Sequence, residues 1–464
     1  MSAANAALSS TLALLRIEFR RSVGLLCFPL LVVAAGWLAK DSMPVGVYTW
    51  LDTSGAIRET VPFVGAFVAG ISAWTAGRNK RRGMADLLSS TPRSLAARDL
   101  TTWAGTALWG AAVYVTLAAV LLSVTWWNAT WGAPPAGYLL VGLLAVLANS
   151  AVGYAAGHYL PSRFITPLVA IGLFVAQFAP INYLSVAPLL PASTFLVGLD
   201  VFMEVPKVAL QQGLWFCGVG AVALAAVVAK SRRGDAASWT LLAGALLLCA
   251  AGFAASMLAV YRQGSFFADE AAPFEYVCEE GGITVCVHPA YEKLLPQAAG
   301  VVNEVGEPLA GIPGAPTRAM QVGSLTPEPA RKAESTAFFT ADSIVDGGNV
   351  GWFRQEVAMH LVEGPAAYQG SAPEAKPTEE DLERCGPGAK EGFVDPALEA
   401  RAVVANWLFK QLDRHESGFS LAQCPNAHRL VHRFANLDPV KRRAWLKENL
   451  AGLRAGEVTL KDLP

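Results

Sequence analysis

Charged residues are scarce in this sequence. Asp, Glu, Lys and Arg make up 16% of its 464 residues, whereas about a quarter is usual for a soluble domain. Apolar residues make up 53%, and the mean hydropathy is +0.38. This balance excludes an ordinary soluble protein, predicts a membrane protein and makes membrane lipid, not nucleic acid, the expected surroundings.

The sequence also lacks the short motifs of common catalytic sites. No G-x-x-x-x-G-K-[ST] phosphate loop occurs, so this chain is not itself an ATPase. Neither a C-x-x-C zinc pattern nor a G-x-S-x-G nucleophile elbow is present. We therefore expect no catalytic residue, no bound cofactor and no metal in this chain.

Two clusters deserve comparison with zinc sites. His428 and His432 have the i, i+4 spacing of H-E-x-x-H proteases, but Arg429 replaces the Glu of the motif, which is the general base. The second cluster, also at helical spacing, comprises Glu356, His360 and Glu363. Surface helices commonly carry His and Glu, so ordinary polar helix faces are the expected reading of both clusters.

Charge and hydropathy divide the chain into two unlike parts. Residues 1–261 contain the long apolar runs and hold 16 Lys and Arg against 9 Asp and Glu. Residues 262–464 have few apolar runs and hold 20 Lys and Arg against 28 Asp and Glu. We predict an α-helical membrane domain over 1–261, followed by a soluble α+β domain over 262–464, which is long enough to bury its own core.

Seven apolar segments are long enough to be considered transmembrane helices, which need about 17–25 residues. These segments are 23–39, 60–77, 102–124, 138–160, 164–180, 208–229 and 238–260. Two further segments differ from them. Residues 8–21 are amphipathic and are expected to lie in the membrane interface. Residues 181–207 are apolar but broken by Pro, which predicts a re-entrant or surface-lying segment.

The connections between these segments carry an uneven positive charge. If the N-terminus is cytoplasmic, the inside connections hold thirteen Lys and Arg residues and the outside connections hold four. Positive residues accumulate on the cytoplasmic side of membrane proteins. We therefore expect a multi-pass protein of the cell membrane with a cytoplasmic N-terminus and with residues 262–464 outside the cytoplasm.

One inside connection is long and strongly basic. It reads GRNKRRGMADLLSSTPRS over residues 77–94, and an apolar stripe of Met84, Leu87, Leu88 and Leu95 follows Gly83. Two interpretations are open: a solvated helix that rests on lipid headgroups, or a surface helix that inserts into a cytoplasmic partner.

Residues 81–92, RRGMADLLSSTP, resemble the segment after the second span of type-2 ABC-exporter permeases. The interfacial N-terminal helix, the spans and the broken outer segment follow in the order of that family over residues 8–230. The family usually has an acidic residue shortly before the Gly, where this chain has Asn79, Lys80 and Arg81. The resemblance implies that residues 78–98 form a coupling helix that docks on an ATP-binding subunit through Arg81, Arg82, Gly83, Met84, Asp86, Leu87, Leu88 and Pro92.

The resemblance also implies how such a transporter would be assembled. The separate ATP-binding subunit would use ATP and Mg, and a second permease copy, identical or related, would complete the membrane part. Fixed charges are nearly absent from the predicted spans, and His158 is expected to be an interfacial anchor. A path for hydrophobic or amphipathic cargo could be lined by Phe63, Phe67, Phe174, Gln177 and Asn182, for which plain helix packing is the alternative.

The second domain is expected to mix strands and helices. Residues 282–287 and 336–341 read as strands, and residues 289–310 read as one helix. Asp395 and Asp438 each precede a Pro and predict helix starts. Residues 364–380, rich in Pro, Gly and Ala, predict a mobile loop.

Four cysteines in this domain predict two disulfides. An even number of cysteines outside the cytoplasm favours oxidised pairs. Four cysteines can pair in three ways. We favour the arrangement in which a Cys278–Cys286 disulfide closes a hairpin and a Cys385–Cys424 disulfide pins the mobile loop.

Three functional classes remain open on the sequence. The leading one is the permease subunit of an exporter, whose outer domain receives cargo, gates the exit or binds a partner. An ABC-coupled receptor or scaffold for signalling is the second, and a membrane-anchored hydrolase is the third.

Overall fold

The computed structural model describes most of the chain, namely residues 3–43, 47–81, 83, 94–178, 189, 209–232, 235–263, 273–323, 335–340, 350–364, 377–387, 395–410 and 424–464. The chain divides into two compact units. The first contains residues 1–43 and 48–271, and the second contains residues 44–47 and 272–464. Each unit is described by itself below.

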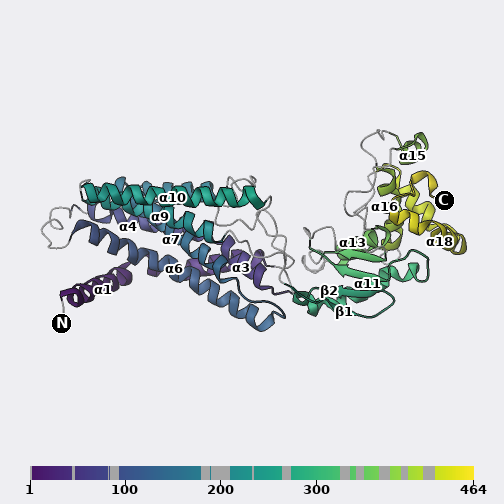
Figure 1. The fold of residues 1–464 in the computed structure, drawn as a ribbon, viewed down its shortest axis with the longest axis horizontal. Helices are drawn as coiled ribbons and strands as arrows, with labels where there is room; N and C mark the ends of the chain where they lie inside the picture. Colours follow the sequence, from purple (N-terminus) through teal and green to yellow (C-terminus); the bar gives the residue numbers. More distant parts are fainter. Residues whose placement is uncertain are drawn as a thin grey trace. The chain divides into compact units, whose positions relative to one another are not determined.

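The first unit is a bundle of helices (Figure 1). They are α1 (Ala3–Arg21), α2 (Gly24–Asp41), α3 (Trp50–Glu59), α4 (Val61–Arg81), α6 (Leu95–Asn128), α7 (Ala136–Tyr159), α8 (Ile165–Phe178), α9 (Ala209–Ser231) and α10 (Ala236–Gln263). The predicted interfacial helix over 8–21 falls within α1. The predicted re-entrant segment 181–207 lies outside the described residues, apart from Leu189.

Six helices among the described residues are long and apolar enough to cross a membrane: Gly24–Asp41, Trp50–Arg78, Leu95–Asn128, Ala136–Tyr159, Leu210–Ser231 and Ala236–Leu258. The protein is therefore a multi-pass helical membrane protein. The predicted span 164–180 is not confirmed: the structure describes it as far as residue 178, and α8 has 14 residues. At about 1.5 Å per residue α8 is about 21 Å long, which falls short of a hydrocarbon core of about 30 Å.

Helices α4 and α7 form the centre of the first unit through small residues. Gly153 and Gly157 of α7 lie against the backbone of Ala69 and Ala73 of α4, so closely that a Cβ at either Gly would overlap the facing carbonyl. Small residues four apart let membrane helices approach closely and gain van der Waals contact. In the same contact, Ser72 and Ser150 share a hydrogen bond of 2.9 Å.

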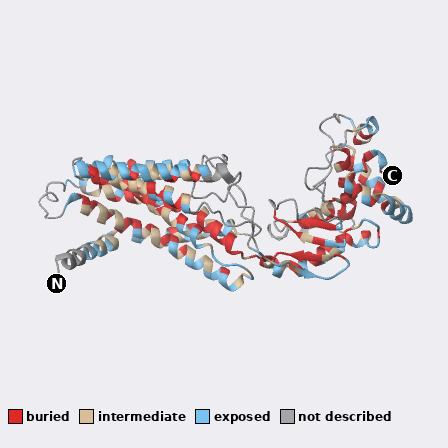
Figure 2. Ribbon diagram, viewed as in Figure 1, coloured by how far each residue is buried: buried red, intermediate tan, exposed pale blue. Residues whose placement is uncertain are grey.

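Burial differs strongly among the spans (Figure 2). In the Trp50–Arg78 span 72% of the most apolar window is buried, whereas the figure for Ala236–Leu258 is 11%. The α3–α4 span is therefore central, and α10 lies at the edge, where its exposed apolar side chains suit contact with lipid.

The second unit is an α+β domain with a small sheet. The strands β1 (Val277–Glu279), β2 (Thr284–Val287), β3 (Arg318–Gln321) and β4 (Thr336–Phe339) lie in that order. The first pair is antiparallel, and the other two pairs are parallel. The described helices of this unit are α11 (Leu295–Gly306), α13 (Val350–Val362), α15 (Glu379–Cys385), α16 (Pro396–Lys410), α17 (Ala427–Ala435) and α18 (Pro439–Ala455).

Helix starts in this unit follow local chemistry. The carboxylate of Asp395 accepts a hydrogen bond of 2.9 Å from the backbone N–H of Ala397. The carboxylate of Asp438 does the same for Val440, also at 2.9 Å. Both predicted N-caps are thereby confirmed. The predicted single helix over 289–310 was too simple, because short 3₁₀ turns flank α11 on both sides.

The predicted cysteine pairing is confirmed. Cys278 and Cys286 face each other across the β1–β2 pair and are joined by a disulfide. Cys385, at the end of α15, is joined to Cys424. Of the predicted loop 364–380, residues 365–376 lie outside the described residues. The far end of that loop is helical, because Thr378 forms a capping box with Asp381 and starts α15.

Candidate functional site at the basic helix ends

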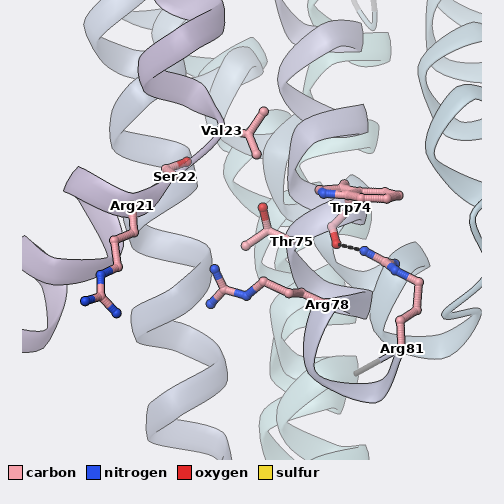
Figure 3. Close-up of a pocket in the computed structure, with 7 residues that line it drawn as sticks. All are labelled: Arg21, Ser22, Val23, Trp74, Thr75, Arg78 and Arg81. Atoms are coloured by element: carbon pink, nitrogen blue, oxygen red, sulfur yellow. Dashed lines mark hydrogen bonds between the residues drawn. The ribbon is translucent and has the colours of Figure 1, made fainter. Parts of the chain in front are cut away.

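A basic pocket lies where α1, α2 and α4 meet. It has a volume of about 170 Å³ and is lined by Arg21, Ser22, Val23, Trp74, Thr75, Arg78 and Arg81. Figure 3 shows Arg78 reaching from α4 toward the side where Arg21 projects from α1. Two candidate spans end here, because one begins at Gly24 and the other finishes at Arg78.

Helix α1 is held to two membrane helices near this pocket. Glu18 forms an ion pair of 3.1 Å with Arg78 of α4. Phe19 stacks on Trp109 of α6 with ring centroids 4.2 Å apart, and the indole N–H of Trp109 donates to the Phe19 carbonyl at 2.8 Å. A displacement of the end of α4 would therefore also move α1, and through α1 it would be transmitted to α6.

The last turn of α4 is closed by Arg81. Its guanidinium lies over the Trp74 ring, 4.1 Å from the centroid, and donates to the Trp74 carbonyl at 2.6 Å. Gly83 follows with a φ of 65°, in the left-handed region, which ends the helix direction at little cost for Gly. Of the predicted docking residues the structure describes these two, and the other six lie outside the described residues: Arg82, Met84, Asp86, Leu87, Leu88 and Pro92.

A buried carboxylate near the start of α6 joins three helices, and the sequence analysis did not find it. Asp99 is 9% exposed and accepts hydrogen bonds from Ser231 of α9 at 2.7 Å and Tyr154 of α7 at 3.4 Å. The predicted anchor His158 also lies here, with Nδ1 4.0 Å from the same carboxylate. Because the predicted span began at residue 102, Asp99 was assigned to a connection. An acidic residue just before an apolar run was the available signal.

The predicted cargo path falls on two neighbouring helices. Phe63 and Phe67 lie on α4, with ring centroids 4.8 Å apart, and Phe174 lies on α8. Phe67 is 49% exposed and Phe174 is 39% exposed. The rings of Phe67 and Phe174 therefore face outward from the described part of one chain, where lipid or another chain can contact them, whereas Phe63 is half-buried and packs against the core of this unit.

The polar members of that set behave differently. Gln177 is 8% exposed, and its side-chain amide pairs with Asn149 of α7 through hydrogen bonds of 3.3 and 3.4 Å. This contact fastens α8 to α7, in keeping with the helix-packing alternative for Gln177. Asn182 lies outside the described residues.

The second unit buries a charged cluster at His360. Its Nδ1 lies 3.1 Å from Glu363, and its Nε2 lies 3.6 Å from Glu356. Burial alone would lower the pKa of His360, but hydrogen bonds to both carboxylates and their charges raise the pKa to about 9. Arg401 lies 3.7 Å from Glu363 on its other side. His360 is therefore a positively charged member of an ion-pair network.

The predicted histidine pair lies on the surface of α17. The Nε2 atoms of His428 and His432 are 3.2 Å apart, and the intervening residue is Arg429. Within the described ranges, no group of three or more His, Cys, Asp and Glu side chains is placed to hold a metal ion.

Comparison with known proteins adds no relative. No family model matches this chain, and no curated protein matches its sequence. Function is therefore inferred from the residues and contacts described above, together with the resemblance of residues 81–92.

Proposed function

We propose that this chain is the membrane subunit of an ATP-driven exporter of the type-2 ABC class. A separate ATP-binding subunit would dock on residues 78–98, and a second permease copy would complete the transporter. The cargo would be hydrophobic or amphipathic. The positive charge of the predicted inside connections supports a position of residues 262–464 outside the cytoplasm, where this domain would receive cargo, gate its exit or bind a partner.

One observation supports this proposal above the others: the proposed docking segment is bracketed by two anchored helix ends. At its start, Arg78 pairs with Glu18 of α1. Directly after it, Asp99 accepts hydrogen bonds from Tyr154 and Ser231, on α7 and α9. A force applied between these points would reach several membrane helices at once, as coupling of ATP hydrolysis to transport requires.

The proposal is tested on the apolar pair Leu87 and Leu88. Burial of each Leu in an interface is worth about 1.5–3 kcal/mol, and Asp at both positions would remove that gain. We expect Leu87→Asp with Leu88→Asp to insert normally but to lose co-purification with the ATP-binding subunit. The orientation signal remains, because this change leaves every basic residue of the connection in place.

A matched control is available on the two sides of another predicted inside connection, residues 161–163. Leu160 and Phe164 are exposed by 59% and 81%, and Leu160→Asp with Phe164→Asp introduces the same charges there. This control should keep its ATP-binding subunit. Equal binding by the two double variants and the unchanged protein would remove the docking proposal. Stimulation of ATP hydrolysis by an amphipathic cargo would separate export from signalling.

A further inference from the structure

The two disulfides of the second unit differ in how easily an external thiol can reach them. Cys278 of β1 is exposed, and its partner Cys286 of β2 is 0% exposed. Cys385 and Cys424 are both buried, at 0% and 5%. Exposed disulfides are the ones that thiols reduce readily. Cys278–Cys286 is therefore the better placed of the two for exchange with an external thiol.

A guanidinium group lies against the buried sulfur of this disulfide. In the parallel β2–β3 pair Arg318 lies opposite Thr284, and Cys286, two residues along β2, has its side chain on the same face of the sheet. The Nε and Nη2 groups of Arg318 donate to Cys286 Sγ at 3.3 and 3.2 Å. Nη2 also donates to Cys278 Sγ at 3.5 Å. The positive charge is thus closest to the sulfur that an external thiol cannot reach.

The position of this charge favours one direction of attack on the disulfide. A thiolate attacks one sulfur and expels the other as a thiolate, and exchange is faster when the expelled thiolate is more stable. A basic side chain beside a cysteine stabilises its thiolate. Attack at the exposed Cys278 Sγ would expel Cys286 Sγ as a thiolate against the guanidinium of Arg318. The negative charge of the adjacent Glu279 projects from the opposite face of β1, because successive side chains of a strand alternate.

We propose that Cys278–Cys286 is a site of reversible thiol–disulfide exchange with a protein dithiol. The first thiol of the partner attacks as its thiolate and bonds to Cys278 Sγ. The Cys278–Cys286 bond breaks, and its electron pair stays on Cys286 Sγ beside Arg318. The second thiol of the partner, as its thiolate, then attacks the mixed disulfide and releases the thiolate of Cys278.

The exchange is balanced in electrons and protons. The chain gains two electrons and ends with two cysteine thiols, while the partner is oxidised from a dithiol to a disulfide. The two protons of the partner's thiols reach Cys278 and Cys286 by way of solvent. In this proposal Cys385–Cys424 is the structural disulfide of the unit. The inference uses contacts within the second unit and does not depend on the proposed function.

The test follows the reduction of both disulfides in the full-length, detergent-solubilised protein. The free cysteines Cys27, Cys217 and Cys249 are first blocked with N-ethylmaleimide. Dithiothreitol is then added for increasing times, and the new thiols are alkylated and assigned by mass spectrometry of peptides. Arg318→Gln removes the charge beside the sulfurs, and Arg318→Lys keeps a positive charge there. The matched control is Arg433→Gln, which removes a charge from an exposed position of α17.

We expect Cys278–Cys286 to be reduced at least about tenfold faster than Cys385–Cys424, because one of its sulfurs is accessible. Arg318→Gln should slow this reduction at least about threefold, since the expelled thiolate loses its stabilising charge. Arg318→Lys should retain most of the rate, and Arg433→Gln should leave it unchanged. Equal rates for the two disulfides would overturn the proposal, as would equal effects of Arg318→Gln and Arg433→Gln.

A second measurement identifies the attacked sulfur in the unchanged protein. A thioredoxin whose second active-site cysteine is replaced by Ser cannot resolve the mixed disulfide that it forms. We expect this probe to be trapped on Cys278, because that sulfur is exposed and Cys286 is the leaving group. A complex linked through Cys286, or no complex under conditions that reduce the disulfide with dithiothreitol, would contradict exchange with a protein dithiol and leave Cys278–Cys286 as a structural link.

Discussion

Each of the two units of this protein is stabilised internally by different interactions. In the first unit, small residues bring α4 and α7 into backbone contact, and polar contacts such as Asn149–Gln177 fasten single pairs of helices. In the second unit, two disulfides, aspartate caps and a buried ion-pair network stabilise short elements. Close packing substitutes for the hydrophobic effect between helices in lipid, whereas a small water-exposed domain gains from covalent links.

This difference predicts that the first unit is most sensitive to added volume. In Gly153→Val the new side chain would overlap the backbone of Ala69, and α4 and α7 would have to separate. We expect a loss of more than about 4 kcal/mol, above the usual range for overpacking. Thermal unfolding in detergent, followed by size-exclusion chromatography, measures it. Gly172→Val is the matched control, because a Cβ at Gly172 of α8 meets open space.

The second unit should instead be most sensitive to loss of its covalent links. Cys385–Cys424 spans a sequence separation of 39 and Cys278–Cys286 a separation of 8. In the chain-entropy model the longer loop gives about 4 kcal/mol and the shorter about 2.5 kcal/mol. Double Cys→Ala variants, compared by proteolysis in increasing denaturant, should lose stability in that order. The reverse order would mean that the sheet depends more on its hairpin than loop entropy predicts.

The sequence predicted features of both units where local chemistry decides them. Asp395 and Asp438 were identified because capping involves residues adjacent in the chain, and the cysteine pairs because their even number and expected compartment favour oxidation. The apolar runs located the six long apolar helices found among the described residues, since length and hydropathy suffice for that. Of the remaining predicted span, 164–180, the structure describes a helix of 14 residues, so the count of seven spans is not confirmed.

Contacts between distant residues were not predictable in this way. Asp99 and Ser231 form a hydrogen bond although they are 132 positions apart in the sequence. Neither local segment contains a pattern that predicts this contact. The basic pocket likewise joins the ends of α1 and α4, which hold Arg21 and Arg78. Basic residues were expected at these ends, but their sharing of one cavity depends on how the helices pack.

The buried charge of the second unit makes its stability depend on pH. The pKa of His360 is raised to about 9 in the folded protein, above about 6.5 in an unfolded chain. Its contribution is therefore complete below pH 6.5 and is lost as the pH rises through about 9. The loss should reach up to about 3 kcal/mol in this window. Denaturant unfolding at pH 6.5 and pH 9.5 measures it.

Two variants identify the titrating group. His360→Gln should remove most of the pH dependence, because it removes the group whose pKa is raised into this range. His432→Gln changes an exposed histidine of the same unit and should retain the dependence. If the His360→Gln variant still loses stability steeply between pH 6.5 and 9.5, another group is responsible for the pH dependence.

The smallest effect on stability should come from the partly exposed ion pair between α1 and α4 in the first unit. Glu18 and Arg78 have side chains that are 26% and 25% exposed, and such pairs usually contribute about 0–1 kcal/mol. Glu18→Gln, Arg78→Gln and the double variant form a cycle whose coupling energy, measured by thermal unfolding in detergent, should not exceed about 1 kcal/mol. If α1 transmits movement from the proposed docking segment, the same variants should nevertheless reduce cargo-stimulated ATP hydrolysis by the proposed transporter. A coupling energy well above 1 kcal/mol would mean that the ion pair stabilises the fold as strongly as the His360 network does. Unchanged cargo-stimulated hydrolysis would mean that α1 anchors the chain in the membrane and takes no part in transmitting movement.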